Sequence, residues 1–104
     1  MPEPSLPRFS RKSRVFPVSP SIDLRPDANG RFVLSITGND YRGLLYAIAR
    51  VFSKHRINLH TAKIMTLGER IEDVFLIDGE KLQQPRQQIQ FERDMIEVLR
   101  VHDT

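Results

Sequence analysis

Residues 32–55 read FVLSITGNDYRGLLYAIARVFSKH and change their hydrophobic period near the centre. In the first part, apolar residues alternate with polar or smaller ones, which is typical of a strand that buries one face. The alternating apolar residues are Phe32, Leu34 and Ile36. From Leu44 to His55 the apolar residues instead recur at the spacing of an amphipathic helix. The stretch therefore predicts a strand that turns directly into a helix.

A further strand is predicted upstream of this stretch. Residues 21–25 alternate apolar and polar side chains, while Pro17 and Pro20 before them are typical of an edge position in a sheet. Residues 26–30 are turn formers in a row. The strand at 21–25 is therefore expected to pair with the central strand as a hairpin.

Two more strands are predicted downstream of the first helix. Residues 59–66 fit a strand whose alternation slips in phase between Leu59 and Ala62, so we expect a β-bulge there. Residues 67–70 read as a hairpin turn, and residues 71–77 then alternate regularly. These features indicate a second hairpin.

A second helix is predicted from Pro85, because proline suits the first turn of a helix. Its apolar side consists of Ile89, Phe91, Met95, Ile96, Val98 and Leu99. In a ferredoxin-like sandwich the last strand lies antiparallel beside the first, and here residues 21–25 can take that place. We expect an α+β fold, a four-stranded antiparallel sheet with two helices on one face, in a permuted ββαββα order.

The 104 residues suffice for one domain with one core. The chain has 16 Lys and Arg residues against 13 Asp and Glu residues, a net charge of +3. Residues 1–14 hold four of the basic residues and one acidic residue, so the remainder has 12 of each and is neutral. We expect a disordered basic linker at 1–14 and a domain at 15–104. A neutral domain argues against nucleic-acid binding.

Residue content also disfavours several kinds of chemistry. The absence of cysteine excludes disulfides and thiolate metal sites and fits a cytoplasmic protein. No apolar run approaches the roughly 20 residues of a membrane span. His55, His60 and His102 lack the spacing of a helical metal pair, so no metal site is expected. No nucleophile–base arrangement or phosphate-binding glycine loop occurs, so we expect no catalytic residue and no cofactor in this chain.

The segment 38–45 joins the central strand to the first helix and is the candidate functional site. The first backbone N–H groups of a helix lack acceptors within it, and the helix dipole favours an anion there. A carboxylate suits that position, Asn39 or Asp40 can accept from an ammonium group, and Gly43 lets a ligand approach the backbone closely. The alternative is structural: Asp40 is only an N-cap, and Gly38 and Gly43 only serve the turn.

Three motifs of the sequence resemble the ACT domain family. They are Asp40-Tyr41-Arg42-Gly43-Leu44-Leu45-Tyr46, Ala62-Lys63-Ile64-Met65-Thr66-Leu67-Gly68-Glu69-Arg70 and Glu72-Asp73-Val74-Phe75. More narrowly, they are similar to the C-terminal ACT repeat of the family of PII uridylyltransferase/uridylyl-removing enzymes. The resemblance covers roughly residues 15–101. One departure is Arg42, where the family usually has proline; its side chain points either to solvent or to a ligand carboxylate.

The resemblance implies a regulatory domain that senses an amino acid, glutamine, for a parent enzyme of nitrogen regulation. The ligand-binding residues that it implies are Gly38, Asn39, Asp40, Tyr41, Arg42, Gly43 and Leu44. It also implies adjacent ACT and catalytic domains as partners, with the nucleotidyltransferase and hydrolase activities in the latter. An isolated fragment of this kind is expected to form a homodimer, with no nucleic-acid or membrane partner.

Two alternatives to sensing are kept. The first is docking or dimerisation without a small ligand, because Val74 and Leu76 lie on the open face of their strand, where a two-layer domain leaves them in water. The second is RNA binding by a ferredoxin-like domain, although the strand at 70–75 has two acids and lacks the paired aromatics that stack bases.

The sequence also places a carboxylate, that of Asp73, among apolar residues on the buried face of its strand. A buried carboxylate requires a partner.

Overall fold

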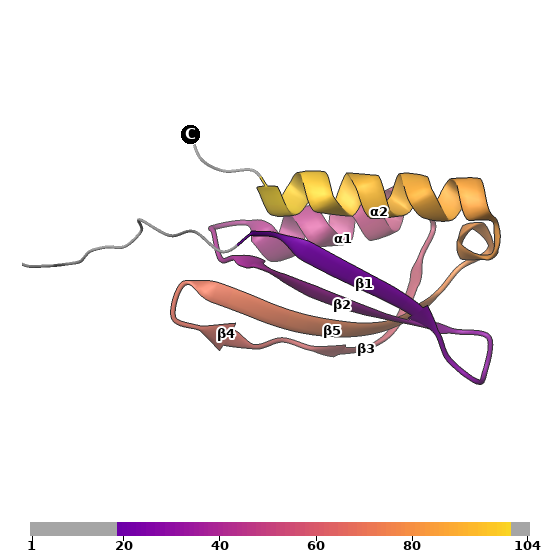
Figure 1. Cartoon of the computed structure of the whole chain (residues 1–104), viewed down its shortest axis with the longest axis horizontal. Coiled ribbons are helices and arrows are strands. Elements are labelled where there is room, and N and C mark those ends of the chain that lie inside the picture. Colours follow the sequence, from indigo (N-terminus) through magenta and orange to yellow (C-terminus); the bar gives the residue numbers. More distant parts are fainter. Residues whose placement is uncertain (1–18, 101–104) are drawn as a thin grey trace, which may run out of the picture.

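The computed structural model describes residues 19–100 (Figure 1). Its elements in chain order are β1 (Ser21–Pro26), β2 (Phe32–Asn39), α1 (Leu44–Lys54), β3 (Asn58–Lys63), β4 (Thr66–Leu67), β5 (Arg70–Asp78), the short 3-10 helix η1 (Glu80–Gln83) and α2 (Pro85–Arg100). The predicted linker at 1–14 and His102 lie outside the described residues. The helix predicted from Pro85 starts at that residue, whereas η1 before it was not predicted.

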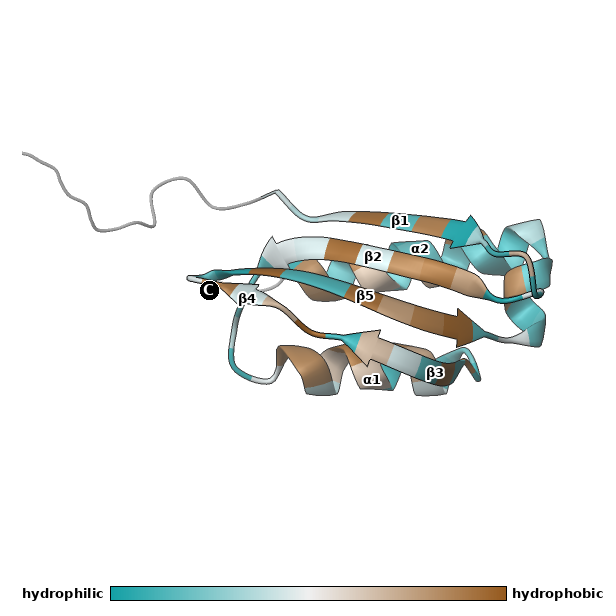
Figure 2. Ribbon diagram, turned by 90° about the horizontal axis from the view of Figure 1, so that it is seen from below, coloured by the Kyte–Doolittle hydropathy of each residue, from teal (hydrophilic) through white to brown (hydrophobic). Residues whose placement is uncertain are grey.

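The strands form one antiparallel sheet in the order β1-β2-β5-β3, with β4 also paired to β5. The first hairpin is confirmed: β1 pairs antiparallel with β2, and Ile22 lies opposite Ile36. Both helices lie on the same side of the sheet (Figures 1 and 2). The predicted combination of an antiparallel sheet with two helices is therefore confirmed, and the fold is mixed α+β.

The predicted count of four strands is wrong, because the strand expected at 59–66 is split into β3 and β4. The expected bulge is present, between Leu59 and Thr61. At Met65 the chain leaves the regular ladder: its N–H donates to the Asp73 carboxylate at 3.0 Å, while its carbonyl accepts from the Glu72 N–H at 2.9 Å. A side-chain oxygen thus takes the place of a backbone acceptor, and regular pairing resumes only at β4.

The core lies between the sheet and the helices. Alternate residues of β2 and β5 are buried, in agreement with the predicted period of two. The sheet and η1 contribute Phe32, Leu34, Ile36, Ile71, Phe75, Ile77 and Leu82, and the helices contribute Leu44, Ile48, Val51, Phe52, Phe91, Met95 and Leu99. Phe52 joins the layers, with its ring centroid 5.4 Å from that of Phe75 and 6.2 Å from that of Phe91. Ile89, predicted on the apolar side of its helix, is 55% exposed.

A buried polar contact ties the two helices together. His55, at the C-terminal end of α1, is buried, and its Nε2 lies 2.7 Å from an Asp94 carboxylate oxygen. The Lys54 ammonium lies 3.0 Å from the same oxygen, and the His55 ring packs edge-on against Phe91. Partial burial raises the pKa of Asp94, but hydrogen bonds from His55, Lys54 and Gln90 outweigh it and hold that pKa below the ordinary value.

Candidate ligand-binding site

The predicted site segment connects the end of β2 to the start of α1 and lies beside the turn between β4 and β5 (Figure 1). Asn39 is the last residue of β2 and pairs with Arg70. The Asp40 N–H then donates to the Glu69 carbonyl at 2.8 Å, which fixes the segment to that turn. The sequence prediction of a strand that passes through a short turn into a helix is confirmed.

Three of the predicted site residues hold the segment in place. Gly38 is buried, and a side chain there would contact Leu99 at about 3.6 Å. Leu44 is a core residue at the start of α1. The Tyr41 hydroxyl donates to the Val98 carbonyl in α2 at 2.7 Å, and burial raises the pKa of this phenol. Gly38, Leu44 and Tyr41 thus attach the segment to the core and to α2.

The outer surface of the segment is formed by Asp40, Arg42 and Gly43, which are exposed. Gly43 is the N-cap of α1 and has a left-handed backbone with φ of 87°, and no side chain caps the helix. The structural alternative that Asp40 is the N-cap is therefore wrong. The physical reason is the glycine turn, closed by the Leu44 N–H donating to the Tyr41 carbonyl at 3.1 Å, which places the cap three residues after Asp40.

The start of α1 presents backbone N–H groups without acceptors. The Leu44 N–H bonds to Tyr41 and the Ala47 N–H bonds to Gly43, but the N–H groups of Leu45 and Tyr46 have no acceptor among residues 19–100. The first turn of α1 holds no acidic residue. The positive end of the helix dipole is thus uncompensated by a side chain, which is the electrostatic setting that favours a carboxylate or another anion.

Asp73 lies on the buried face of β5, opposite Ile36 in β2, and is 1% exposed. One of its oxygens accepts from the Met65 N–H, and the other, Oδ2, has no partner among the described residues. Burial raises the pKa of Asp73, the Met65 hydrogen bond lowers it, and the charge of Asp40 raises it further. The sequence predicted that this carboxylate needs a partner, but it could not show that only one oxygen has one.

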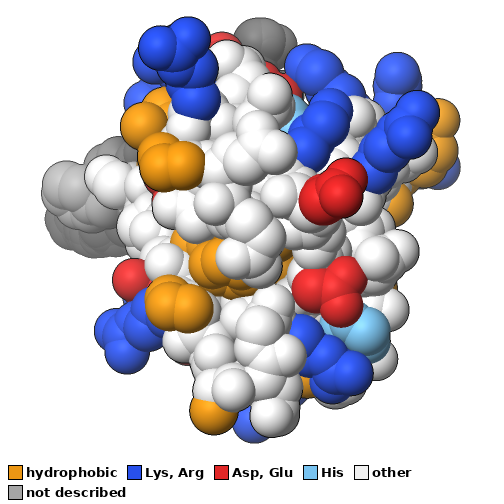
Figure 3. Space-filling model, turned by 90° about the vertical axis from the view of Figure 1, so that its right-hand side faces the viewer, with side chains coloured by type: hydrophobic (Ala, Val, Ile, Leu, Met, Phe, Trp, Pro, Cys, Tyr) orange, Lys and Arg blue, Asp and Glu red, His pale blue; other side chains and the backbone are white. Residues whose placement is uncertain are grey.

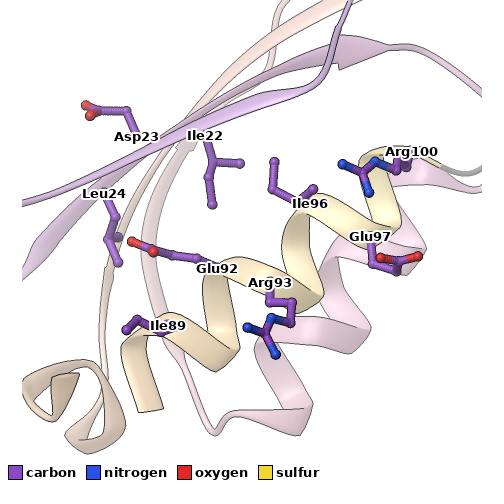
Figure 4. Close-up of a pocket in the computed structure, with 9 residues that line it drawn as sticks. All are labelled: Ile22, Asp23, Leu24, Ile89, Glu92, Arg93, Ile96, Glu97 and Arg100. Atoms are coloured by element: carbon purple, nitrogen blue, oxygen red, sulfur yellow. The ribbon is translucent and has the colours of Figure 1, made fainter. Parts of the chain in front are cut away.

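Other hollows on the described surface lie away from residues 38–44. A groove of about 560 Å³ runs between β1 and α2 (Figure 4), where Ile22 and Leu24 point from the strand toward the helix. A second hollow of about 440 Å³ lies between the two helices, and a third of about 430 Å³ is lined by polar residues next to the β1–β2 turn. At that end of the molecule (Figure 3), basic and acidic side chains are interspersed.

The described histidines each bond to a single carboxylate. His55 lies against Asp94, and His60 lies 2.6 Å from Asp78. Hydrogen bonds from Asn58 and His60 lower the pKa of Asp78. Within residues 19–100, no group of three or more His, Asp or Glu side chains comes together in a way that could hold a metal ion, and no helix there is long and apolar enough to cross a membrane.

Curated relatives match almost the whole chain. It is 55% identical over 97% of its length to the bifunctional uridylyltransferase/uridylyl-removing enzyme of Cupriavidus pinatubonensis, 53% identical to that of Cupriavidus metallidurans and 51% identical to that of Burkholderia vietnamiensis. The chain is a homologue of one segment of these enzymes. It spans about 12% of the length of each uridylyltransferase/uridylyl-removing enzyme, and no family model matches it.

Proposed function

We propose that the chain is a regulatory domain of the ACT type, which binds an amino acid, glutamine, on behalf of a parent uridylyltransferase/uridylyl-removing enzyme. The observation that carries this proposal is the exposed turn at 38–45, where the N–H groups of Leu45 and Tyr46 have no acceptor among the described residues. The homology to a segment of these enzymes supports the parent. The strand–turn–helix geometry supports the ligand class, because a helix start of this kind suits a carboxylate.

In this proposal the ligand carboxylate lies against the N–H groups of Leu45 and Tyr46. Gly43 has no Cβ, and nothing lies within 4 Å of where a Cβ would be, so a ligand can approach the backbone there. The exposed Asp40 carboxylate accepts from the ligand's ammonium group, and Arg42 is directed to solvent or to the ligand carboxylate. Gly38, Asn39, Tyr41 and Leu44 complete the segment.

The parent chain supplies the remaining parts of the proposed function. Because this chain covers 12% of its relatives' length, the nucleotidyltransferase and hydrolase activities are assigned to the rest of the parent. The domain itself takes part through adjacent ACT and catalytic domains, works in the cytoplasm, and as an isolated fragment pairs with a second copy. The half-exposed Val74 and the neighbouring Leu76 on the helix-free face provide an apolar surface for such contacts.

Calorimetric titration of the full chain with glutamine tests the sensing proposal. We expect saturable heat with glutamine, weaker or no heat with other amino acids, and weaker glutamine binding by Asp40→Asn. Asp23→Asn is the matched control, because Asp23 is an exposed aspartate that pairs with Arg25 on β1, a strand that takes no part in the 38–45 turn. No heat with any amino acid at millimolar concentration, from a folded protein in its native oligomeric state, would refute sensing.

A second candidate function is docking to another part of the parent chain. It is favoured by the groove between β1 and α2, in which Ile89 is 55% exposed and Ile96 is partly buried (Figure 4). Apolar side chains gathered in a surface groove are typical of protein contacts. In the parent enzyme, Ile89→Ser should uncouple the domain from the rest of the chain while glutamine binding by the isolated chain is unchanged. Equal parent regulation in Ile89→Ser and wild type would refute docking at this groove.

RNA binding finds less support from the described residues. Residues 19–100 contain 12 Lys and Arg against 11 Asp and Glu, and both signs are mixed on the surface shown in Figure 3. Phosphate backbones are bound by concentrated positive charge. The balance of charges in the folded part therefore favours the two functions above.

A further inference from the structure

We propose that Asp73 is a second, buried acceptor for the ligand's ammonium group, through its unpartnered oxygen Oδ2. This inference deepens the proposed function and rests on it. The sequence predicted Asn39 or Asp40 as the acceptor, and Asp40 is exposed, so water competes for its hydrogen bonds. Asp73 is 1% exposed, and a hydrogen bond from a cationic group to such a carboxylate is far stronger than one at the surface.

The first argument is the unmet hydrogen-bonding capacity of Asp73. Oδ1 accepts the Met65 N–H at 3.0 Å, whereas Oδ2 is buried and has no partner among residues 19–100. Buried polar atoms are nearly always paired in folded proteins, and a carboxylate without enough donors is costly to bury. A donor from outside the described chain is the partner that this oxygen lacks, and a protonated amine is a donor that also neutralises the charge.

The second argument is the position of Asp73 under the candidate site. It lies opposite Ile36, two residues before Gly38 on β2, and it faces the helices together with the buried residues of β5. Burial is the main cause of the raised pKa of Asp73, and the negative charge of Asp40, on the site segment itself, adds to it. The carboxylates of Asp40 and Asp73 therefore repel each other, and a single positive group close to both relieves this repulsion.

The electrostatic surroundings of Asp73 favour binding of a cation. On the site segment the neighbour is Asp40, and on β5 the adjacent Glu72 points to the opposite face, where it pairs with Arg70. α1 contributes the apolar Leu44 and Ile48 to the core, and its first turn holds no acidic residue. No basic side chain of residues 19–100 pairs with Asp73.

In this proposal the ligand reaches the Asp73 carboxylate past the Ile64–Met65 segment, whose Met65 N–H is bonded to the other oxygen, Oδ1. The segment belongs to neither β3 nor β4, and it is exposed. Met65 is held to β5 through two hydrogen bonds, its N–H to Asp73 and its carbonyl from Glu72. The side chains of Ile64 and Met65 are exposed, and segments with few buried contacts open at low free-energy cost. Displacement of this segment brings the ligand's ammonium group against Oδ2.

The test is calorimetry of the full chain with two ligands, glutamine and N-acetylglutamine, which lacks the ammonium group. Asp73→Asn keeps a carbonyl oxygen for the Met65 N–H but removes the charge, and Glu72→Gln is the matched control on the opposite face of the same strand. We expect Asp73→Asn to weaken glutamine binding at least tenfold, about 1.4 kcal/mol. Glu72→Gln should bind as wild type does. The preference of wild type for glutamine over N-acetylglutamine should shrink by the same factor in Asp73→Asn.

A second measurement separates ligand contact from a structural role and does not depend on any variant folding. The carboxyl carbon of Asp73 is titrated by NMR in the wild-type chain, with and without glutamine. Contact with the ammonium group lowers the pKa of Asp73 upon binding, whereas a purely structural carboxylate keeps its pKa. If wild type binds glutamine but Asp73→Asn binds equally, or the titration does not move, this inference is overturned and the proposed function stands. If wild type binds no amino acid, both fail.

Discussion

Two glycines of the candidate site lie in different structural environments, and their replacement by alanine should have opposite effects on the stability of the fold. Gly43 has φ of +87° and open space around the position of a Cβ, so an added methyl group meets no atom and the cost is entirely in the backbone. Gly38 lies in β2, where the added methyl group would meet Leu99 side-chain carbons at 3.6 and 3.8 Å, which is ordinary contact.

The magnitudes follow from these environments. A left-handed backbone destabilises an L-residue by roughly 1–2 kcal/mol. The lower conformational entropy of the unfolded alanine variant offsets roughly 0.5–1 kcal/mol of this cost. Gly43→Ala should therefore destabilise the fold by about 1 kcal/mol. Gly38→Ala should stabilise it by about 0.5 kcal/mol, since glycine inside a strand is unfavourable by roughly 0.5–1 kcal/mol relative to alanine. In a domain of this size, the separation of about 1.5 kcal/mol is roughly 6–12 °C in Tm.

Urea and thermal unfolding followed by circular dichroism will measure both variants, and unchanged urea m values will show that the same surface is exposed on unfolding. Gly43→Asn serves as a control, because asparagine tolerates the left-handed region better than alanine does. It should lose less stability than Gly43→Ala. The reasoning is refuted if Gly38→Ala costs as much as Gly43→Ala, or if asparagine and alanine at position 43 are equally destabilising.

Three further predictions concern the core and its polar contacts. Leu34→Ala should cost roughly 3–5 kcal/mol in urea unfolding, and Val74→Ala, at a half-exposed position, less than 1 kcal/mol. Tyr41→Phe should lose about 1 kcal/mol in thermal melts, since it removes the hydrogen bond to α2. Because the folded-state pKa of Asp94 is below its ordinary 3.8, its ionised form adds stability above that pH and loses it as pH falls through the lowered pKa. Asp94→Asn should reduce this loss of stability at low pH. An unchanged loss would contradict its assignment to the contact between His55 and Asp94.

The sequence predicted the parts of the fold that depend on hydrophobic period. The alternation in β2 and β5 and the helical spacing in α1 each report a single buried face, so they identify the element and its inner residues. The β-bulge near Leu59 was also predictable, because an added residue shifts the alternation. These signals depend on residues close together in the sequence, and the elements predicted from them agree with the structure.

Other features were not predictable because they depend on contacts between elements or on backbone conformation, which the hydrophobic period does not report. The split between β3 and β4 follows from the Asp73 carboxylate, eight residues after Met65, replacing a backbone acceptor. The spacing around Ile89 indicated a buried side chain, but Ile89 is 55% exposed and lines the groove between α2 and β1. In the site, aspartate before a helix is typical of an N-cap, and only the backbone at Gly43 shows that the helix starts later.

The irregular path from β3 to β4 has a consequence for how copies of the protein can meet. An uninterrupted outer strand is a template on which further strands can add indefinitely, as in fibrils. Here the bulge after Leu59 and the departure from the ladder at Met65 cut that template into short pieces. This border therefore offers an added strand only short stretches of regular backbone pairing, which disfavours growth of the sheet past it.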